Sequence, residues 1–266
     1  MDAVGRLAGD HVTRVQAREW RKGQPLLPLA DALAVEEPLE IRVEGVPTAI
    51  TMRTPGEDVD LTIGFLATEG VIDGMDDVRA IATVAENTVD VRLAEGVPTA
   101  RARSADRALY ATSSCGVCGK ASLDRLLVAR RAPLSPWTPD PAMLATLPAR
   151  LRVAQEGFLS SGGLHAAALF DTTGLLHVVR EDVGRHNAVD KVIGACLGAD
   201  LPMQEGVGLL VTSRGGFEIV QKALVVGIPV VAVLGAATTL AVDAARAGGI
   251  TLVGWLRGER WVGYTP

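Results

Sequence analysis

The segment from residue 164 to residue 255 alternates short apolar runs with stretches that suit helices, and this alternation restricts the fold more than any other feature of the chain. The apolar runs have the length of buried strands. Apolar strands separated by short helices indicate a sheet that is buried on both faces and contains much parallel pairing, so the expected fold class is α/β. Strands are expected over residues 164–170, 175–179, 207–212, 229–234 and 250–255, and helices over 188–197, 217–226 and 240–247.

The region before this segment has the pattern of hairpins around one helix. Apolar and polar residues alternate with period two, which predicts β-hairpins over 39–52, with a turn at Glu44-Gly45, and over 78–93. Between them, Thr54–Glu57 offers an N-cap, a proline at the first helical position and a glutamate that can close a capping box. A helix is therefore expected from there to about Gly70.

The chain is expected to divide into three parts. Residues 1–34 lack a clear period and predict a flexible, loosely structured N-terminal arm; residues 35–110 predict a smaller α+β subdomain that contains the hairpins; and residues 111–266 predict the larger α/β domain. The arm carries a small basic cluster of Arg14, Arg18, Arg21 and Lys22, which we interpret as a solvated tail.

Composition limits the classes of function. The 266 residues are 48% hydrophobic, which supplies an ample core, and the formal net charge of −5 argues against a general nucleic-acid binder. Three cysteines do not make a disulfide framework and suit a reducing cytosol. The first 23 residues lack the apolar core of a signal peptide, and the most apolar stretch, 223–237, is too short for a membrane span. A soluble cytoplasmic protein without a membrane partner is expected.

Two of the three cysteines, Cys115 and Cys118, lie in the glycine-flanked run Ser-Ser-Cys-Gly-Val-Cys-Gly-Lys. The residues that follow, 121–127, suit a helix, so both thiols are expected at or just before a helix N-terminus. The helix dipole and the neighbouring Lys120 favour thiolate over thiol there. Nucleophilic sulfur chemistry is the leading interpretation.

Three other interpretations of this loop stay open: half of a zinc site, a dithiol redox pair, or two structural cysteines. A zinc deaminase would show His-x-Glu followed by Pro-Cys-x-x-Cys, but no histidine here has a glutamate two residues later, and Ser114 precedes Cys115. No resident metal is therefore expected. The remaining zinc candidates would be His11, His165, His177, His186 and Cys196, of which Cys196 lies in an apolar run and is expected in the core.

Two turns between an expected strand and an expected helix have the composition of anion sites. In the run Arg180–Asn187, the side chains of Arg180, Arg185 and His186 are candidates for phosphate binding; the alternative is that the arginines pair with neighbouring carboxylates and that Asp182 or Asn187 caps the helix. In the run 212–218, Arg214 and two glycines could bind a phosphate, and a tight turn that needs glycine explains the same residues equally well. The second run lacks the Lys-Ser/Thr of a P-loop.

The C-terminal segment mixes arginine with tryptophan, which suits a flat heterocycle that carries phosphate. An ordinary surface hairpin explains the same residues. The candidate binding residues in this segment are Gly254, Trp255, Leu256, Arg257, Gly258, Glu259 and Arg260.

Together these segments resemble the formate dehydrogenase accessory sulfurtransferase family, FdhD, from about residue 34 to the C-terminus. The long run Arg180–Lys191 is the most specific match. The other matching segments are 36–39, 52–56, 64–70, the Cys-x-x-Cys loop and 163–167. Two positions depart from the family pattern: Gly216 stands where a serine is expected, and 261–264 differs from the usual ending.

The resemblance implies a sulfur carrier that takes persulfide sulfur from a cysteine desulfurase and passes it to the bis-molybdopterin guanine dinucleotide form of the molybdenum cofactor, before this cofactor enters formate dehydrogenase. It implies a cytidine-deaminase-like three-layer α/β/α sandwich without the deaminase zinc, and a homodimer. Cys115 would carry the persulfide, and the guanine dinucleotide, as bound substrate, would contact the segment 254–260 and Arg214. We further hypothesise that Cys118 attacks the Cys115 sulfur and expels sulfide.

Overall fold

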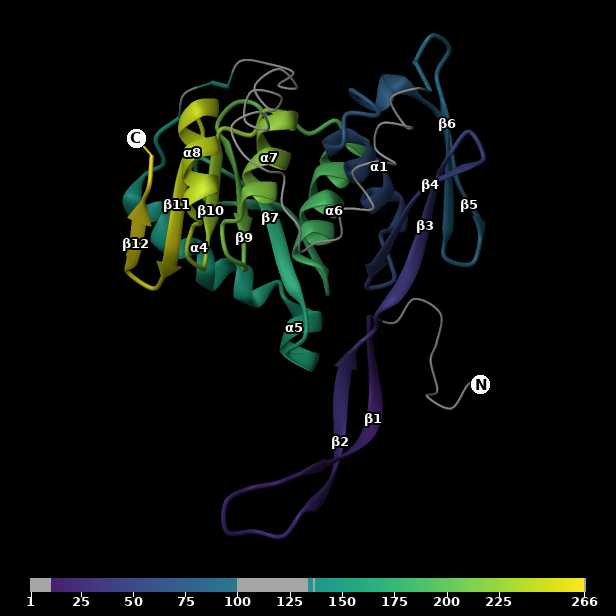
Figure 1. Cartoon of the computed structure of the whole chain (residues 1–266). Helices are drawn as coiled ribbons and strands as arrows, with labels where there is room; N and C mark the ends of the chain where they lie inside the picture. Colours follow the sequence, from purple (N-terminus) through teal and green to yellow (C-terminus); the bar gives the residue numbers. More distant parts are fainter. Residues whose placement is uncertain (1–10, 100–133, 136, 266) are drawn as a thin grey trace.

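The computed structural model describes residues 11–99, 134–135 and 137–265. These residues form a six-stranded sheet with helices on both faces, a four-stranded sheet beside it with one helix between the two, packed on a helix of the larger sheet, and a two-stranded arm (Figure 1). Cys115 and Cys118, together with the predicted boundary at residue 110, lie outside the described residues.

The six-stranded sheet is mixed rather than largely parallel. Its strand order is β12-β11-β10-β9-β7-β8. Only the β9–β10 and β10–β11 pairs are parallel, and the other three pairs are antiparallel, so the prediction of much parallel pairing is correct only at the centre of the sheet. The strands are β7 (His165–Asp171), β8 (Leu176–Asp182), β9 (Val207–Val211), β10 (Val230–Val233), β11 (Thr251–Arg257) and β12 (Arg260–Gly263).

Helices cover both faces of this sheet, which confirms the α/β class and its three layers. The helices α6 (Arg185–Gly198), α7 (Phe217–Val226) and α8 (Thr239–Gly248) bury one apolar cluster against alternate residues of the central strands. The helix α4 (Pro141–Val153) buries a second cluster against the intervening residues, which face the other way. A short helix, α5 (Glu156–Ser161), leads from α4 into β7. No helix among the described residues has the length and apolar character of a bilayer span.

The four-stranded sheet contains the two predicted hairpins. Strands β3 (Glu37–Val43) and β4 (Val46–Arg53) form the first hairpin, β5 (Val78–Ala85) and β6 (Thr88–Leu93) form the second, and a parallel β3–β6 pair joins them in the order β4-β3-β6-β5. One face of this sheet packs on the helix α1 (Asp58–Thr68), and the turn η1 (Met75–Asp77) precedes β5.

The helices α1 and α6 join the two sheets by direct contact of their backbones. A Cβ added at Gly64 would lie 1.8 Å from the carbonyl oxygen of Asp190, and one added at Gly194 would lie 1.8 Å from the carbonyl oxygen of Asp60. The two contacts pair residues in opposite order, so the helices run antiparallel. Only glycine permits this approach.

The predicted capping box at the start of α1 is wrong. The helix begins at Asp58 after Glu57, whose φ of 48° is left-handed, and no side chain caps it. The Thr54 amide instead donates to Asp182 Oδ2, and its hydroxyl accepts from the Val183 amide. Thr54 therefore connects the two sheets rather than ending a helix.

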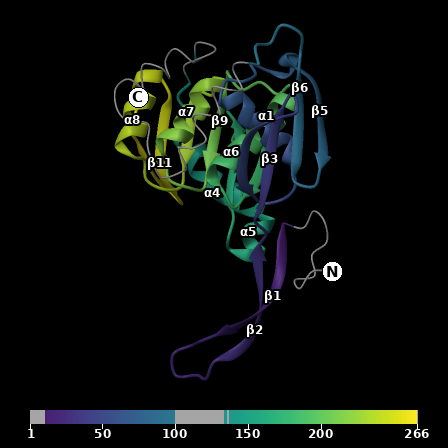
Figure 2. The same ribbon diagram turned by 45° about the vertical axis from the view of Figure 1, so that its right-hand side comes forward.

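The expected loosely structured arm contains a regular β-hairpin. Strands β1 (Val12–Glu19) and β2 (Leu27–Ala34) pair antiparallel from Val12–Ala34 to Glu19–Leu27. This hairpin projects away from both sheets (Figure 2), and β2 leads almost directly into β3. The sequence carries little sign of this pairing, because β2 contains three alanines, a proline and an aspartate, which have low strand propensity.

Candidate functional site

A cavity of about 490 Å³ opens beside the carboxyl ends of β9 and β10 and the N-terminal ends of β7 and α6. Ligands of α/β proteins bind at this edge of the sheet, because loops and helix N-termini converge there. The lining residues are His165, Arg185, Thr212, Ser213, Arg214, Leu234, Gly235 and Arg257.

Two strand-to-helix loops, 212–216 and 234–238, form the floor of the cavity and are hydrogen-bonded to each other. The Gly235 amide donates to the Ser213 carbonyl (3.1 Å), and the Gly215 amide donates to the Ala236 carbonyl (2.9 Å). A side chain at Gly235 would meet the Arg214 Cα at 3.0 Å, so only glycine allows the loops to approach this closely. The backbone beneath Arg214 is thereby fixed.

Three arginines face this cavity from separate elements. Arg185 is the first residue of α6, Arg214 lies in the β9–α7 loop, and Arg257 ends β11. None of the three forms an ion pair with a carboxylate in the part of the chain that the structure describes, although Arg257 Nε donates to the Leu234 carbonyl (3.4 Å) and its guanidinium lies 5.3 Å from the Trp255 ring centroid. Three guanidinium groups that have no carboxylate partner within residues 11–99, 134–135 and 137–265 make this cavity suited to a polyanion.

The two histidines at this edge have different surroundings. Burial, together with the positive charges of Arg185 and His186, lowers the pKa of His165, so its ring is neutral near pH 7. Its Nδ1 lies 3.4 Å from Thr212 Oγ1. His186 Nε2 lies 3.3 Å from Glu218 Oε2 without the geometry of a hydrogen bond, and this contact lowers the pKa of that carboxyl. His165 therefore presents a neutral ring to the cavity, whereas His186 is held by Glu218.

Most of the run Arg180–Lys191 connects the two sheets instead of facing the cavity. Arg180 donates to Asp60 Oδ2 of α1 through Nε (3.0 Å) and Nη2 (2.8 Å). The run therefore contains both expected roles: Arg185 lines the cavity, and Arg180 is structural. Arg180 does not pair with the neighbouring carboxylates, as the alternative proposed, but with Asp60 of α1, and Arg185 forms no carboxylate ion pair within the described residues.

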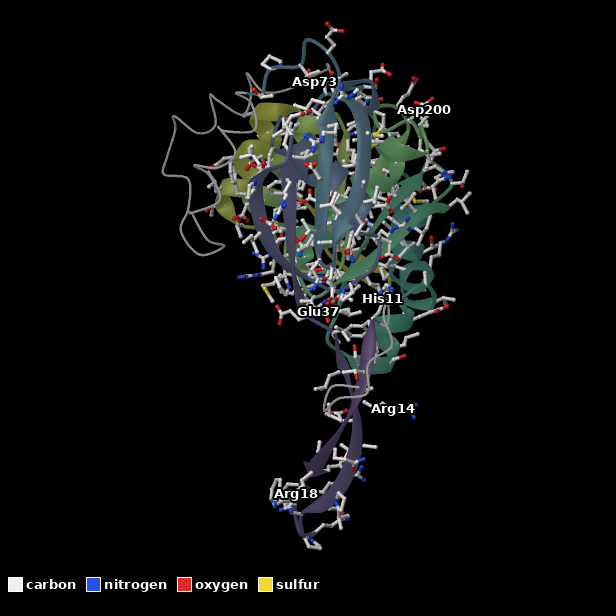
Figure 3. The ribbon with its side chains drawn as sticks, turned by 90° about the vertical axis from the view of Figure 1, so that its right-hand side faces the viewer. His11, Arg14, Arg18, Glu37, Asp73 and Asp200 are labelled. Atoms are coloured by element: carbon white, nitrogen blue, oxygen red, sulfur yellow. The ribbon has the colours of Figure 1, made fainter. Side chains whose placement is uncertain are left out.

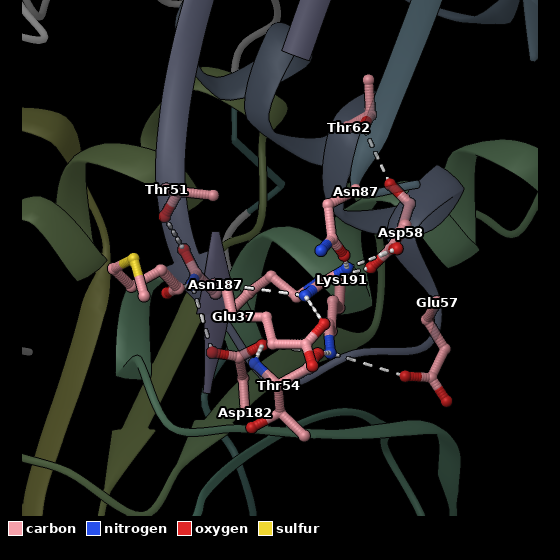
Figure 4. A network of polar contacts seen from close by, with 12 residues as sticks. Glu37, Thr51, Thr54, Glu57, Asp58, Thr62, Asn87, Asp182, Asn187 and Lys191 are labelled. Carbon is pink, nitrogen blue, oxygen red and sulfur yellow. Dashed lines mark hydrogen bonds and ion pairs between the residues drawn. The ribbon is translucent and has the colours of Figure 1, made fainter. Parts of the chain in front are cut away.

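The centre of this connection is a buried network around Lys191 (Figure 4). Lys191 is fully buried; its Nζ lies 3.0 Å from Asp182 Oδ2 and donates to the Thr54 carbonyl (2.9 Å). Burial raises the pKa of Asp182, and the charge of Lys191 opposes that rise. Asn187 donates to the Met52 carbonyl (2.7 Å) and so binds the start of α6 to β4. A buried pair with these additional partners fixes the orientation of α6, and thus of Arg185.

The C-terminal candidates form a hairpin, of which one residue lines the cavity. Gly254–Arg257 belong to β11, Gly258 and Glu259 form the turn, and Arg260 begins β12. Leu256 is fully buried in the core cluster under α4, and Trp255 has a left-handed φ of 53°. In this segment Arg257 alone lines the cavity. The segment is therefore a surface hairpin, as one interpretation held, and it supplies one arginine to the cavity, as the other held.

The cavity also contains residues that the sequence did not single out. Leu234 and Gly235 lie in the loop after β10, which is the third strand-to-helix turn of the sheet. The sequence could have pointed to this loop, because it follows a buried strand in the same way as the turn that contains Arg214. Such turns lie at the same edge of the sheet.

Of the cysteines, only Cys196 is among the described residues. It is buried in the core between α6 and the sheet, and burial raises its pKa to about 12, so it is inert as a nucleophile. No group of three or more histidine, cysteine, aspartate or glutamate side chains that could hold a metal occurs in the described ranges. The roles of Cys115 and Cys118 stay predictions.

Comparison with known proteins identifies the family. The profile described as the FdhD/NarQ family matches residues 34–266. The chain belongs to this family. Proteins named "Sulfur carrier protein FdhD" are 52% identical over 242 residues in Streptomyces coelicolor (86% of this chain and 85% of that protein) and 50% identical over 250 residues in Mycobacterium tuberculosis (88% and 90%).

A solved structure shares the fold. The crystal structure of a candidate formate dehydrogenase accessory protein from Desulfotalea psychrophila superposes with a TM-score of 0.78, covering 97% of this chain and 98% of that chain at 22% identity. At this level of identity the likeness concerns the fold alone. It covers nearly the whole of both chains.

Proposed function

We propose that this FdhD/NarQ family member is a cytoplasmic sulfur carrier for the maturation of formate dehydrogenase. Cys115 accepts persulfide sulfur from a cysteine desulfurase and passes it to the bis-molybdopterin guanine dinucleotide cofactor before this cofactor enters the enzyme. The observation that carries the proposal is the cavity with three arginines in a chain about half identical to proteins named sulfur carriers. Such a cavity is what a carrier needs to hold an anionic acceptor.

The cavity accounts for the binding half of the proposal. Its volume of about 490 Å³ lies within the usual range for small-molecule sites and is enough for one nucleotide portion of the cofactor. Arg185, Arg214 and Arg257 would contact the phosphates from three sides, and the sequence predicts a phosphate or cofactor contact for all three. Neutral His165 can accept or donate a hydrogen bond at the same edge.

The sulfur chemistry would take place at the Cys-x-x-Cys loop. The Cys115 thiolate attacks the outer sulfur of the donor persulfide, so that the donor leaves as a thiolate and Cys115 becomes a persulfide. Cys118 then attacks the inner sulfur, which expels hydrosulfide to the molybdenum and leaves a Cys115–Cys118 disulfide. A cellular thiol reductant restores both thiols before the next cycle.

Formate dehydrogenase activity in cells that depend on this chain tests the proposal. Cys115→Ala should abolish maturation while guanine-nucleotide binding by the purified protein stays at the level of the unmodified chain. Ser122→Ala, in the same segment, is the matched control and should retain maturation. Full activity with Cys115→Ala would mean that the chain binds the cofactor without transferring sulfur. Stoichiometric bound zinc would instead indicate a hydrolase.

The second cysteine has its own test. If Cys118 releases the sulfide, Cys118→Ser should accept sulfur from the desulfurase at the normal rate and then retain it as a persulfide. Formate dehydrogenase that matures at the normal rate with this variant would remove Cys118 from the mechanism.

A further inference from the structure

The cavity contains a histidine and a threonine whose side chains face each other. His165 begins β7, Thr212 follows β9 at the same edge of the sheet, and both line the cavity. Thr212 Oγ1 accepts a hydrogen bond from the Ala166 amide (3.0 Å) and lies 3.4 Å from His165 Nδ1. A hydroxyl group has one hydrogen to donate and two lone pairs. The Ala166 amide uses one lone pair, so the hydrogen and the second lone pair are both available to His165.

This hydroxyl group suits both protonation states of His165. In the neutral ring, Nδ1 accepts the Thr212 hydrogen, and the ring hydrogen is on Nε2. In the charged ring, Nδ1 carries a hydrogen and donates it to the second lone pair of Oγ1, and the hydroxyl hydrogen is free to turn toward another acceptor. Nδ1 therefore has a hydrogen-bond partner in either state.

The charges on the elements next to His165 favour the neutral ring while no anion is bound. Burial of the ring is the largest cause of its low pKa, and Arg185 and His186 of α6 lower the pKa further. Asp182 of β8, directly opposite His165 in the β7–β8 pair, raises the pKa. However, Asp182 Oδ2 lies 3.0 Å from Lys191 Nζ, which offsets its charge.

The other charged groups at this edge lie on the remaining elements around the cavity. They are Arg214 of the β9–α7 loop, Arg257 at the end of β11, and Glu218 of α7, which lies 3.3 Å from His186. The described residues that line the cavity include three arginines and no carboxylate, so a further positive charge is unfavourable there. A bound anion reverses this balance, because it offsets the arginine charges and attracts an imidazolium.

We propose that His165 takes up a proton at Nδ1 when a phosphate-bearing ligand enters the cavity, and that it thereby becomes a fourth cationic contact for this ligand. The proton comes from the solvent, and the only bond that forms is N–H. The Thr212 hydroxyl hydrogen turns from the ring toward the ligand in the same step. This inference rests on the proposed binding of the nucleotide portion of the cofactor in this cavity. It does not depend on sulfur transfer by Cys115.

Proton uptake makes the affinity for the ligand depend on pH. The pKa of His165 lies below 6.5 in the unbound protein, and bound phosphate raises it. The gain in affinity is therefore complete below the unbound pKa and is lost as the pH rises through the bound pKa. Between the two pKa values, one pH unit changes the dissociation constant by up to about ten-fold, because one proton is taken up. Arginines alone would give no such dependence near neutral pH, since they stay charged.

Calorimetry of GDP-glucose binding to the full chain tests this inference. Both phosphates of this probe are esterified, so the probe has no proton that titrates near neutral pH. Titrations near pH 6.5 in buffers of different ionisation enthalpy measure the protons taken up on binding. The unmodified protein should take up a fraction of one proton, and its dissociation constant should fall by at least about three-fold from about pH 8 to about pH 6.

Substitutions of single histidines identify the group that takes up the proton. His165→Gln should bind GDP-glucose without proton uptake, and its affinity should stay near that of the unmodified protein at high pH. His177→Gln is the matched control, because His177 is paired with Asp171 (2.8 Å) and does not line the cavity, so uptake should be unchanged. His11→Gln is a second control, because His11 lies at the root of the arm (Figure 3).

Substitutions at Thr212 test its role as the partner of the ring. Thr212→Ser retains the hydroxyl group and should retain proton uptake. Thr212→Val removes the acceptor for the charged ring and should shift uptake to lower pH. Circular dichroism verifies that each variant is folded. Equal pH profiles for Thr212→Val and Thr212→Ser would show that this hydroxyl does not stabilise the charged ring, which would overturn that part of the proposal.

NMR of the histidine rings locates the proton directly. The ring resonances that are missing in His165→Gln should titrate below pH 6.5 in the unbound protein and at higher pH with GDP-glucose bound. Binding without proton uptake, or uptake that persists in His165→Gln, would overturn this inference and leave the proposed function intact. If GDP-glucose does not bind, the proposed use of the cavity fails, and this inference fails with it.

Discussion

The backbone contact between α1 and α6 predicts a large effect from the smallest possible substitution. In Gly64→Ala the new Cβ would lie 1.8 Å from the Asp190 carbonyl oxygen and 2.6 Å from its carbon. Ordinary contact begins near 3.4 Å, so the helices must separate by about 1.5 Å. No side-chain rotation relieves the clash, because the other atoms belong to a backbone.

The cost can be compared with what alanine gains. Overpacking lowers the free energy of unfolding by about 1–3 kcal/mol, and this site lies at the upper end because the clash is with backbone atoms. The higher helix propensity of alanine offsets up to about 1 kcal/mol of this loss. A net loss of about 2 kcal/mol is expected, which lowers the midpoint of thermal unfolding by about 4–8 °C in a chain of this size.

The assay compares the free energies and midpoints of unfolding of Gly64→Ala and Gly198→Ala, measured with urea and with heat. Gly198 also belongs to α6, but a Cβ there meets nothing within 4 Å, so Gly198→Ala should be neutral or stabilise by up to about 1 kcal/mol. If Gly64→Ala is as stable as Gly198→Ala, close helix contact does not join the two sheets and the reasoning fails.

Three further predictions concern the cavity. Arg214→Gln should weaken guanosine diphosphate binding about ten-fold or more by calorimetry, and added salt should reduce the difference; unchanged affinity would place the nucleotide elsewhere. His165 has a pKa below the usual 6.5, so just below pH 6.5 the unfolded chain binds more protons than the folded chain, and folding stability decreases as the pH is lowered. In urea titrations His165→Gln should lessen this decrease. An equal dependence of stability on pH in both proteins would contradict the lowered pKa. Gly216 has extended backbone angles at the N-cap of α7 and room for a side chain, so Gly216→Ser should stabilise by about 0.5–1 kcal/mol in thermal unfolding, whereas a loss of stability would show that serine does not fit there.

The sequence predicted the elements of the main sheet because their local signals agree with their burial. Each apolar run from β7 to β11 is a strand, and each of the three stretches predicted as helices is a helix, within a few residues. Period-two alternation likewise identified both hairpins of the four-stranded sheet. Strand direction was not predictable in the same way, because pairing such as β7 against β9 depends on contacts distant in the sequence.

The sequence was less informative where a residue's partner lies far along the chain. Thr54 has every local feature of an N-cap, yet its hydrogen bonds go to residues 182 and 183. Arg180 and Arg185 are equally plausible phosphate ligands in the sequence, and only the position of Asp60 on α1 makes Arg180 structural. Of the C-terminal candidates, the direction of each side chain in β11 decides that Arg257 lines the cavity while Leu256 enters the core.

The most direct test of the sulfur-carrier proposal is intact mass spectrometry of the protein after incubation with a cysteine desulfurase and L-cysteine. The account predicts a mass increase of one sulfur that dithiothreitol removes and that Cys115→Ala abolishes. Cys196 remains in that variant as an internal control, because its burial and raised pKa, about 12, make it unreactive. A chain that gains no sulfur under these conditions, or gains it equally without Cys115, would contradict the account.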